Sequence, residues 1–339
     1  MKDFVIKTLI KDMNDDLDAF SSYGKDTFDK IEALKKKDVK YGGSLLRIVF
    51  RGNKFICEEC GGDNRSKDVF KLIENVLEYA KSMGRMVPDM TVYVRVSDSY
   101  AYEYQDLPIF IFAKPINKKG ILFPDNTFVC HQVINKCENW DRTVRLIDEK
   151  CKGSNIEKRN EIFFKGANTG AKKYNLRYLL SEERIPGLPL KIVLETQYEP
   201  MYSFCNSKYL LNLPGHQPWS YRFKYLFLMR SLVINVAVRV HYSEVDYNDK
   251  WINFFDNIFV PGEDYVELVY DWYENSDNGE RYRKLVREIK GTYDYYEAHP
   301  EEYNKMVDNG YRKVKTITNK FVYEMFYDLL VRYNRKLVN

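Results

Sequence analysis

The chain has 339 residues, of which 45% are apolar, and its 53 Lys and Arg residues nearly balance its 49 Asp and Glu residues. This length predicts two domains of ordinary size, each with its own core. The formal net charge of +4 excludes the basic surplus of a dedicated nucleic-acid-binding protein, and the composition excludes a disordered or fibrous chain. The 28 Tyr and 20 Phe residues suit either core packing or stacking against a polar ligand such as a sugar.

The most apolar segments predict neither a signal peptide nor a membrane-spanning helix. Lysines interrupt the apolar residues of the first 12 positions, and no small-residue cleavage site follows them. Residues 225–240 contain Arg230 and Arg239 and are shorter than the roughly 18 to 20 uncharged residues that a membrane helix needs. The six cysteines lack the spacing of a disulfide framework. We therefore expect a cytoplasmic protein in a reducing compartment, without a membrane span.

The first half of the chain alternates helix and strand patterns. Apolar residues at three- and four-residue spacing predict an amphipathic helix over residues 66–83, which Gly84 ends. Alternating apolar and polar residues predict a strand over residues 90–97, and the apolar run 108–113 predicts another. This alternation is typical of an α/β domain.

The charged segment 140–160 is the predicted boundary between two domains, because its composition suits a surface helix and a connection. Beyond it, the patterns predict three strands (161–164, 190–194 and 208–213), a helix (222–229), a buried strand (231–238) and a long helix (313–338). The predicted units are residues 1–150, residues 151–312 and a C-terminal helix, 313–339, that packs across both domains. Two α/β domains favour an enzyme with a ligand cleft at the carboxyl ends of its strands.

Asp98 is a candidate general base. It directly follows the predicted strand 90–97, which is where an α/β enzyme holds an active-site carboxylate. A carboxylate in this place removes a proton from a hydroxyl group in the transition state. The alternative is an aspartate that caps a turn or a helix.

Residues 163–173 are a candidate anion site. They combine two glycines, polar side chains and three lysines directly after a predicted strand. Exposed backbone N–H groups beside cationic side chains suit a phosphate group. The segment lacks the Gly-Lys-Ser or Gly-Lys-Thr end of a P-loop, and a polar turn that caps the next helix is an equally good explanation.

Ser220 and Arg222 lie just before or within the first turn of the predicted helix 222–229. N–H groups at a helix N-terminus attract anions, and an arginine there can hold a diphosphate through two parallel hydrogen bonds. A cation at this end opposes the helix dipole, which favours a functional role. The alternative is an arginine that pairs with an acidic neighbour.

Metal-binding patterns are weak. Cys57 and Cys60 form a lone Cys-x-x-Cys pair, and the four histidines are scattered. Asp16 and Asp18 form the Asp-x-Asp pattern used by metal-dependent nucleotide-sugar transferases, but no hydrophobic strand precedes them. The sequence contains neither a Gly-x-Ser-x-Gly elbow nor a dinucleotide-binding glycine fingerprint, which weighs against hydrolases and dehydrogenases. We expect no bound metal.

Three blocks of the sequence carry a family resemblance. They are VPDM at 87–90 continuing through Asp98 to Pro108; FKG at 164–166 with Thr169 and Gly170; and KYLLNLPG at 208–215 with SYRFKYLFL at 220–228 and SLV at 231–233. In this order they resemble glycosyltransferase family 90, the capsule-associated and protein O-glucosyltransferase (Rumi-like) family.

The resemblance implies an α/β fold of the GT-B type, in which two Rossmann-like domains face a central cleft and the C-terminal helix crosses between them. The first domain would bind the acceptor and the second the nucleotide-sugar. The implied reaction is an inverting transfer from a UDP-sugar, such as UDP-glucose or UDP-xylose, to a hydroxyl group, with no metal or other cofactor.

The same resemblance assigns roles to individual residues. Asp98 would deprotonate the acceptor hydroxyl, and Arg222 with Ser220 would hold the diphosphate of UDP. Lys165 stands where the family often has Arg, which leaves the donor sugar open. The implied donor site is lined by Lys165, Gly166, Thr169, and Lys173 or Arg177.

Two other hypotheses stay open. One is a non-catalytic protein that binds a sugar or a nucleotide on the same fold, and the other is a metal-dependent transferase that acts through Asp16 and Asp18. The expected partners are a UDP-sugar and a glycan or another hydroxyl-bearing acceptor, and not nucleic acid. A bacterial or viral source fits a chain without an evident signal peptide or disulfide framework.

Overall fold

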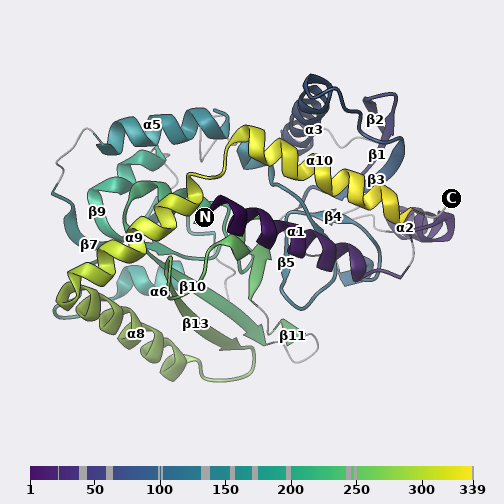
Figure 1. Ribbon diagram of the computed structural model, residues 1–339. Coiled ribbons are helices and arrows are strands. Elements are labelled where there is room, and N and C mark those ends of the chain that lie inside the picture. The colour runs from purple at the N-terminus through teal and green to yellow at the C-terminus, as the bar shows by residue number, and fades with distance from the viewer. Residues whose placement is uncertain are drawn as a thin grey trace.

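The computed structural model describes residues 1–21, 23–37, 44–58, 64–97, 100, 102–130, 138–152, 157–169, 175–195, 200–241, 246–247 and 250–337. Helices and strands alternate along much of the chain, and most of the strands form two sheets (Figure 1). Both sheets contain parallel strand pairs. The prediction of a mixed α/β fold is confirmed.

The first sheet is built from β1 (Leu45–Arg51), β2 (Lys54–Glu58), β3 (Met90–Arg95), β4 (Phe110–Ile111) and β6 (Ile121–Leu122). Its strand order is β2-β1-β3-β4-β6, in which β1 is antiparallel to both neighbours and β3, β4 and β6 are parallel. The strand predicted over residues 90–97 is β3. The run 108–113 contains β4 and the start of β5 (Ala113–Pro115), which pairs instead with β12 (Trp251–Asn253).

The second sheet is built from β7 (Arg159–Gly166), β8 (Leu190–Leu194), β9 (Ser207–Asn212), β10 (Leu232–His241), β11 (Asp246–Tyr247) and β13 (Val266–Tyr273). The parallel strands follow the order β8-β7-β9-β10-β13, and β11 is antiparallel to the end of β10. This is the order of a doubly wound sheet. The strands predicted near residues 161, 190, 208 and 231 are confirmed as β7 to β10.

Side chains of the second sheet alternate between two apolar clusters, as the period of a strand requires. Phe164 and Leu211 pack with α6 (Leu176–Glu182), α8 (Gly279–Ala298) and α9 (Pro300–Val314) on one face. Phe163 and Leu210 belong to the other cluster, which continues through the first sheet. One apolar core therefore connects the two sheets.

The N-terminal part also contains α1 (Lys2–Asp18), α2 (Lys25–Lys37) and α3 (Asn64–Ser82). The predicted helix 66–83 is α3. Gly84 follows it with φ +66°, a left-handed conformation that suits glycine at a helix end.

The charged segment 140–160 is more buried than its composition predicts. Its helix, α5 (Trp140–Lys152), is amphipathic, and Trp140 is fully buried. The Trp140 indole N–H donates to the Ile317 carbonyl at 2.8 Å, so the helix is attached to the C-terminal part of the chain.

The predicted helix 313–338 is in fact the end of α9 followed by α10 (Asn319–Lys336). Thr318 begins α10, because its hydroxyl accepts the Phe321 backbone N–H at 3.1 Å. In Figure 1, α9 lies over the second sheet, whereas α10 runs beside α1 and contacts α3.

A buried ion pair joins the first sheet region to α7 (Phe223–Leu226). Lys224 Nζ lies 2.8 Å from the Asp125 carboxylate, and the two side chains are 2% and 3% exposed. The predicted helix 222–229 is α7 followed by a short 3-10 turn, Phe227–Met229.

Two kinds of cysteine occur. Cys57 is part of a disulfide bond, and so is Cys130, whereas Cys151 and Cys205 are not disulfide-bonded. The bonded cysteines run against the expectation of a reducing compartment, and a cytoplasmic location stays a prediction. Within the described ranges, no helix is long and apolar enough to cross a lipid bilayer.

Candidate functional site

The parallel strands β7 and β9 are neighbours in the second sheet, but their connections lead in opposite directions, to β8 and to β10. Doubly wound sheets bind ligands at such a switch point, outside the carboxyl ends of the two strands. Gly166 ends β7 and Asn212 ends β9. The residues that follow these two positions therefore define the candidate site.

Arg177 forms hydrogen bonds to the residues that follow both strands. It lies in α6 and is only 4% exposed. Its Nη1 donates to the Ala167 carbonyl and to the Thr169 hydroxyl, both at 2.6 Å, after the end of β7. Its Nη2 donates to the Leu213 carbonyl at 3.3 Å, after the end of β9.

Arg222 reaches the same place from the residue before α7. Its Nη1 donates to the Lys165 carbonyl at 2.8 Å. The guanidinium carbons of Arg222 and Arg177 lie 4.9 and 5.1 Å from the centre of the Phe164 ring. Phe164 is therefore a shared cation–π platform for both arginines.

The positive charge of this arginine pair is not neutralised by a carboxylate within the described parts of the chain. Burial, and secondly the charge of Arg222, lower the pKa of Arg177 to about 9. Burial lowers the pKa of Arg222 to about 10. Both groups stay protonated at neutral pH, and a bound anion would offset their desolvation and repulsion.

Gly166 provides the space for Arg222. A Cβ atom at Gly166 would lie 2.9 Å from Arg222 Nη2 and 3.1 Å from the tip of the Phe164 ring. The absence of a side chain therefore allows the guanidinium group to approach the end of β7 closely.

Lys165 and Ser220 also lie at this site, but each has a protein partner. Lys165 is buried, and its Nζ lies 2.9 Å from the Glu195 carboxylate. The Ser220 hydroxyl accepts the backbone N–H of Arg222 at 3.4 Å. The structure thus brings together six of the predicted residues: Lys165, Gly166, Thr169, Arg177, Ser220 and Arg222.

Asp98 and Lys173 lie outside the described residues, so their roles stay predictions. Tyr100, two positions after Asp98, is described. Its hydroxyl donates to the Lys119 carbonyl at 2.6 Å, and its ring contacts the Trp251 ring edge-on at a centroid distance of 6.5 Å.

Asp16 and Asp18 lie on α1 and are used in ion pairs. Asp16 pairs with Lys114 and accepts the Leu122 backbone N–H at 2.9 Å, while Asp18 pairs with Lys336. Residues two apart on a helix do not face each other, so the Asp-x-Asp pattern does not make one metal site. Across the described residues, no group of His, Cys, Asp and Glu side chains has an arrangement that could hold a metal ion.

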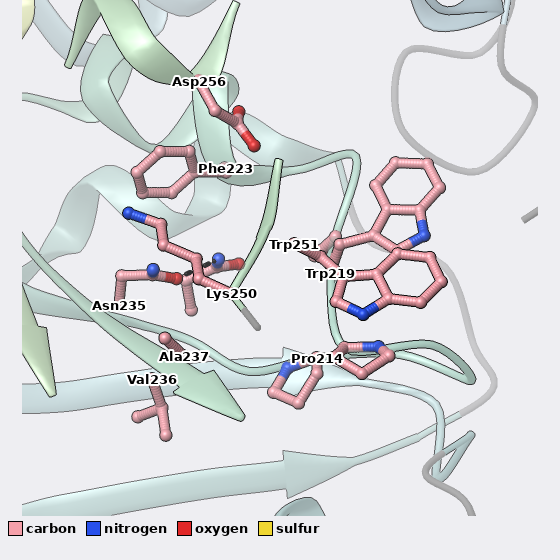
Figure 2. Close-up of a pocket in the computed structure, with 12 residues that line it drawn as sticks. Pro214, Trp219, Phe223, Asn235, Val236, Ala237, Lys250, Trp251 and Asp256 are labelled. Atoms are coloured by element: carbon pink, nitrogen blue, oxygen red, sulfur yellow. Dashed lines mark hydrogen bonds between the residues drawn. The ribbon is translucent and has the colours of Figure 1, made fainter. Parts of the chain in front are cut away.

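A pocket that opens to solvent lies next to Ser220 (Figure 2). In that view the indoles of Trp219 and Trp251 lie on one side, and Lys250 and Asp256 lie on the other. Its lining residues are Asn212, Pro214, Pro218, Trp219, Ser220, Phe223, Asn235, Val236, Ala237, Lys250, Trp251 and Asp256.

Of these lining residues, only Ser220 is among the site residues predicted from the sequence. Trp251 belongs to the three-residue strand β12, which is too short to produce a periodic pattern. The available signal was the aromatic run WINFF at 251–255 followed by Asp256.

Comparison with known proteins agrees with the resemblance. The model of the family described as Glycosyl transferase family 90 matches residues 8–339. The chain is also similar to O-glucosyltransferase rumi of Drosophila melanogaster, at 28% identity over 182 residues. This match covers 48% of the chain and 41% of rumi, so the chain spans less than half of that relative.

Proposed function

Because the chain belongs to glycosyltransferase family 90, we propose that it transfers a sugar from a UDP-sugar to a hydroxyl group of a glycan or a similar acceptor. The observation that carries this proposal is the arginine pair, Arg177 and Arg222, at the switch point of a doubly wound sheet. Two guanidinium groups without a carboxylate partner suit a diphosphate, because each presents parallel donors to phosphate oxygens.

The proposed architecture is of the GT-B type, with the acceptor on residues 1–150, the donor on residues 151–312, and the helical segment 313–339 packed across them. The arginine pair at the strand ends of the second sheet supports the donor assignment. The pairing of β5 with β12 supports a cleft between the sheets, because β12 carries Trp251, which lines the pocket beside the arginine pair.

The proposed mechanism is a single inverting displacement. Asp98 takes the proton of the acceptor hydroxyl, and the acceptor oxygen forms a bond to the anomeric carbon from the face opposite UDP. The bond between that carbon and the β-phosphate oxygen breaks, and its electron pair leaves with UDP. Arg222 and Arg177 stabilise the charge that develops on the diphosphate. UDP-glucose and UDP-xylose are the proposed donors.

Replacing Arg222 with Ala is expected to weaken UDP binding about 10- to 100-fold, because charge-assisted hydrogen bonds each contribute about 1.5–3 kcal/mol. Titration calorimetry with UDP measures this change. Arg287→Ala is the matched control, because Arg287 is exposed on α8 and pairs with Glu280. An unchanged dissociation constant for Arg222→Ala contradicts the diphosphate assignment, and UDP binding without donor turnover favours the non-catalytic alternative.

Gly166→Ala is expected to weaken UDP binding roughly tenfold, since the new methyl group must displace the Arg222 guanidinium group or the Phe164 ring. The fold should be kept, because the end of a flexible side chain can move. Gly291→Ala on α8 is the control, as no atom lies within 4 Å of its added Cβ. Equal UDP affinities of the two variants would show that Gly166 does not position Arg222.

We propose that the reaction needs no metal ion, with the charge of the arginine pair taking the place of a divalent cation at the diphosphate. Excess chelator is therefore expected to leave the turnover of the UDP-sugar unchanged. Loss of turnover that Mn²⁺ or Mg²⁺ restores would instead show that a metal ion takes part in the reaction.

A further inference from the structure

The pocket beside Ser220 lies next to residues that contact the arginine pair. Leu213, whose carbonyl accepts from Arg177, directly precedes the lining residue Pro214. Arg222 lies between the lining residues Ser220 and Phe223. A ligand whose anionic end lies on the two arginines can therefore place its next chemical group in the pocket.

Three lining residues each hold a buried polar atom without a hydrogen-bond partner in the described part of the chain: Asn212 Oδ1, Trp251 Nε1 and Asp256 Oδ1. Asn212 and Trp251 are only 5% and 4% exposed. The second polar atom of each of the Asn212 and Asp256 side chains has a protein partner. Asn212 Nδ2 donates to Asn235 at 2.7 Å, and Asp256 Oδ2 accepts the Asn253 N–H at 3.0 Å. Buried polar atoms of this kind are costly unless water or a ligand pairs with them.

The chemistry of these atoms fits a neutral, hydroxyl-rich ring. One indole N–H donor and two oxygen acceptors match sugar hydroxyl groups, which both donate and accept, and the aromatic rings suit the C–H face of a sugar. A second phosphate fits poorly, because Asp256 carries like charge and Lys250 is already paired with Glu267.

This inference rests on the proposed function: we propose that the pocket holds the monosaccharide of the donor, and that Asp256 is a specificity-determining residue that accepts a sugar hydroxyl and rejects sugars that carry a carboxylate. Rejection follows from the repulsion between two carboxylates in a partly desolvated pocket, where charge is weakly screened.

The protonation of Asp256 makes the selectivity depend on pH. Burial raises the pKa of Asp256 to about 7, an effect that the Asn253 N–H, Lys224 and Lys250 oppose and the charge of Asp125 reinforces. Asp256 is therefore mostly ionised at pH 8 and mostly neutral at pH 6. Rejection of an acidic sugar should be strong at pH 8 and should weaken as the pH falls through 7.

The test compares the affinities of UDP, UDP-glucose, UDP-xylose and UDP-glucuronate for the wild-type protein, Asp256→Asn and the control Asp294→Asn. Asp294 is exposed on α8 and pairs with Lys290. At pH 8 the wild type and the control should bind the two neutral donors at least about tenfold more tightly than UDP-glucuronate, and this ratio should fall at pH 6. Asp256→Asn should lose most of the selectivity and its pH dependence while keeping its affinity for UDP.

Trp251→Phe is a second variant that removes Nε1 and keeps an aromatic ring against Tyr100. It should bind UDP normally and the neutral UDP-sugars several-fold more weakly. If Asp256→Asn does not fold, Trp251→Phe alone tests whether the pocket binds the sugar. Failure of the wild type to bind UDP overturns the proposed function itself. Normal UDP binding with unchanged sugar selectivity in the folded variants overturns the pocket assignment alone.

Discussion

Replacing Asp98 with Asn is expected to slow sugar transfer about 10²- to 10⁴-fold, the usual contribution of a general base, while the affinity for UDP is unchanged. An amide cannot take the proton of the acceptor hydroxyl, whereas the diphosphate is assigned to Arg177 and Arg222, beside the second sheet. Initial transfer rates, together with calorimetry of UDP binding, separate the two effects.

The neighbours of Asp98 support this assignment. The strand β3 ends at Arg95, and Tyr100 contacts Trp251, a residue of the proposed sugar pocket. Asp106→Asn is the control, because Asp106 is exposed and its pair with Lys119 is a surface contact worth little. Turnover of Asp98→Asn near that of the wild type would remove Asp98 from the role of base.

Lys224→Met is expected to lower the free energy of unfolding by about 3–5 kcal/mol, since it leaves the buried Asp125 carboxylate without its cation. Methionine is about as long as lysine and lacks its charge, so the lost stability measures mainly the contribution of the charge, including the contact of Lys224 Nζ with the Phe128 ring. Urea unfolding of the variant and the wild type measures the difference.

The double variant Lys224→Met with Asp125→Asn is the control for this prediction. An asparagine at 125 can still accept the Thr127 N–H, which Asp125 accepts at 2.9 Å, and no charge remains unpaired. The double variant should therefore recover part of the lost stability. A loss below about 1 kcal/mol for Lys224→Met alone would mean that water or another group solvates Asp125.

The predictable parts of the fold are those with long local patterns. The helix α3 shows a three-and-four apolar spacing, and β9 and β10 are nearly continuous apolar runs because they are buried on both faces. The long helix predicted over residues 313–338 is interrupted at Thr318, whose side chain caps a new helix. Apolar residues continue through the break, so the sequence pattern does not reveal it. The short strands β5 and β12 pair across more than 130 positions and have no local signature.

The sequence by itself placed Gly166 after a predicted strand and Arg222 at the start of a predicted helix. The order of its blocks indicated the family, and that resemblance implied Arg177 as a candidate for the donor site. Only the tertiary structure decided which charges are available to a ligand. Lys165 is held by Glu195 and Lys224 by Asp125, whereas Arg177 and Arg222 meet on Phe164 without a carboxylate partner in the described residues. Lys224 and Asp125 are 99 positions apart. Because ion pairing depends on distance in space, no local sequence pattern distinguishes a cation that is paired within the protein from one that is available to bind an anionic ligand.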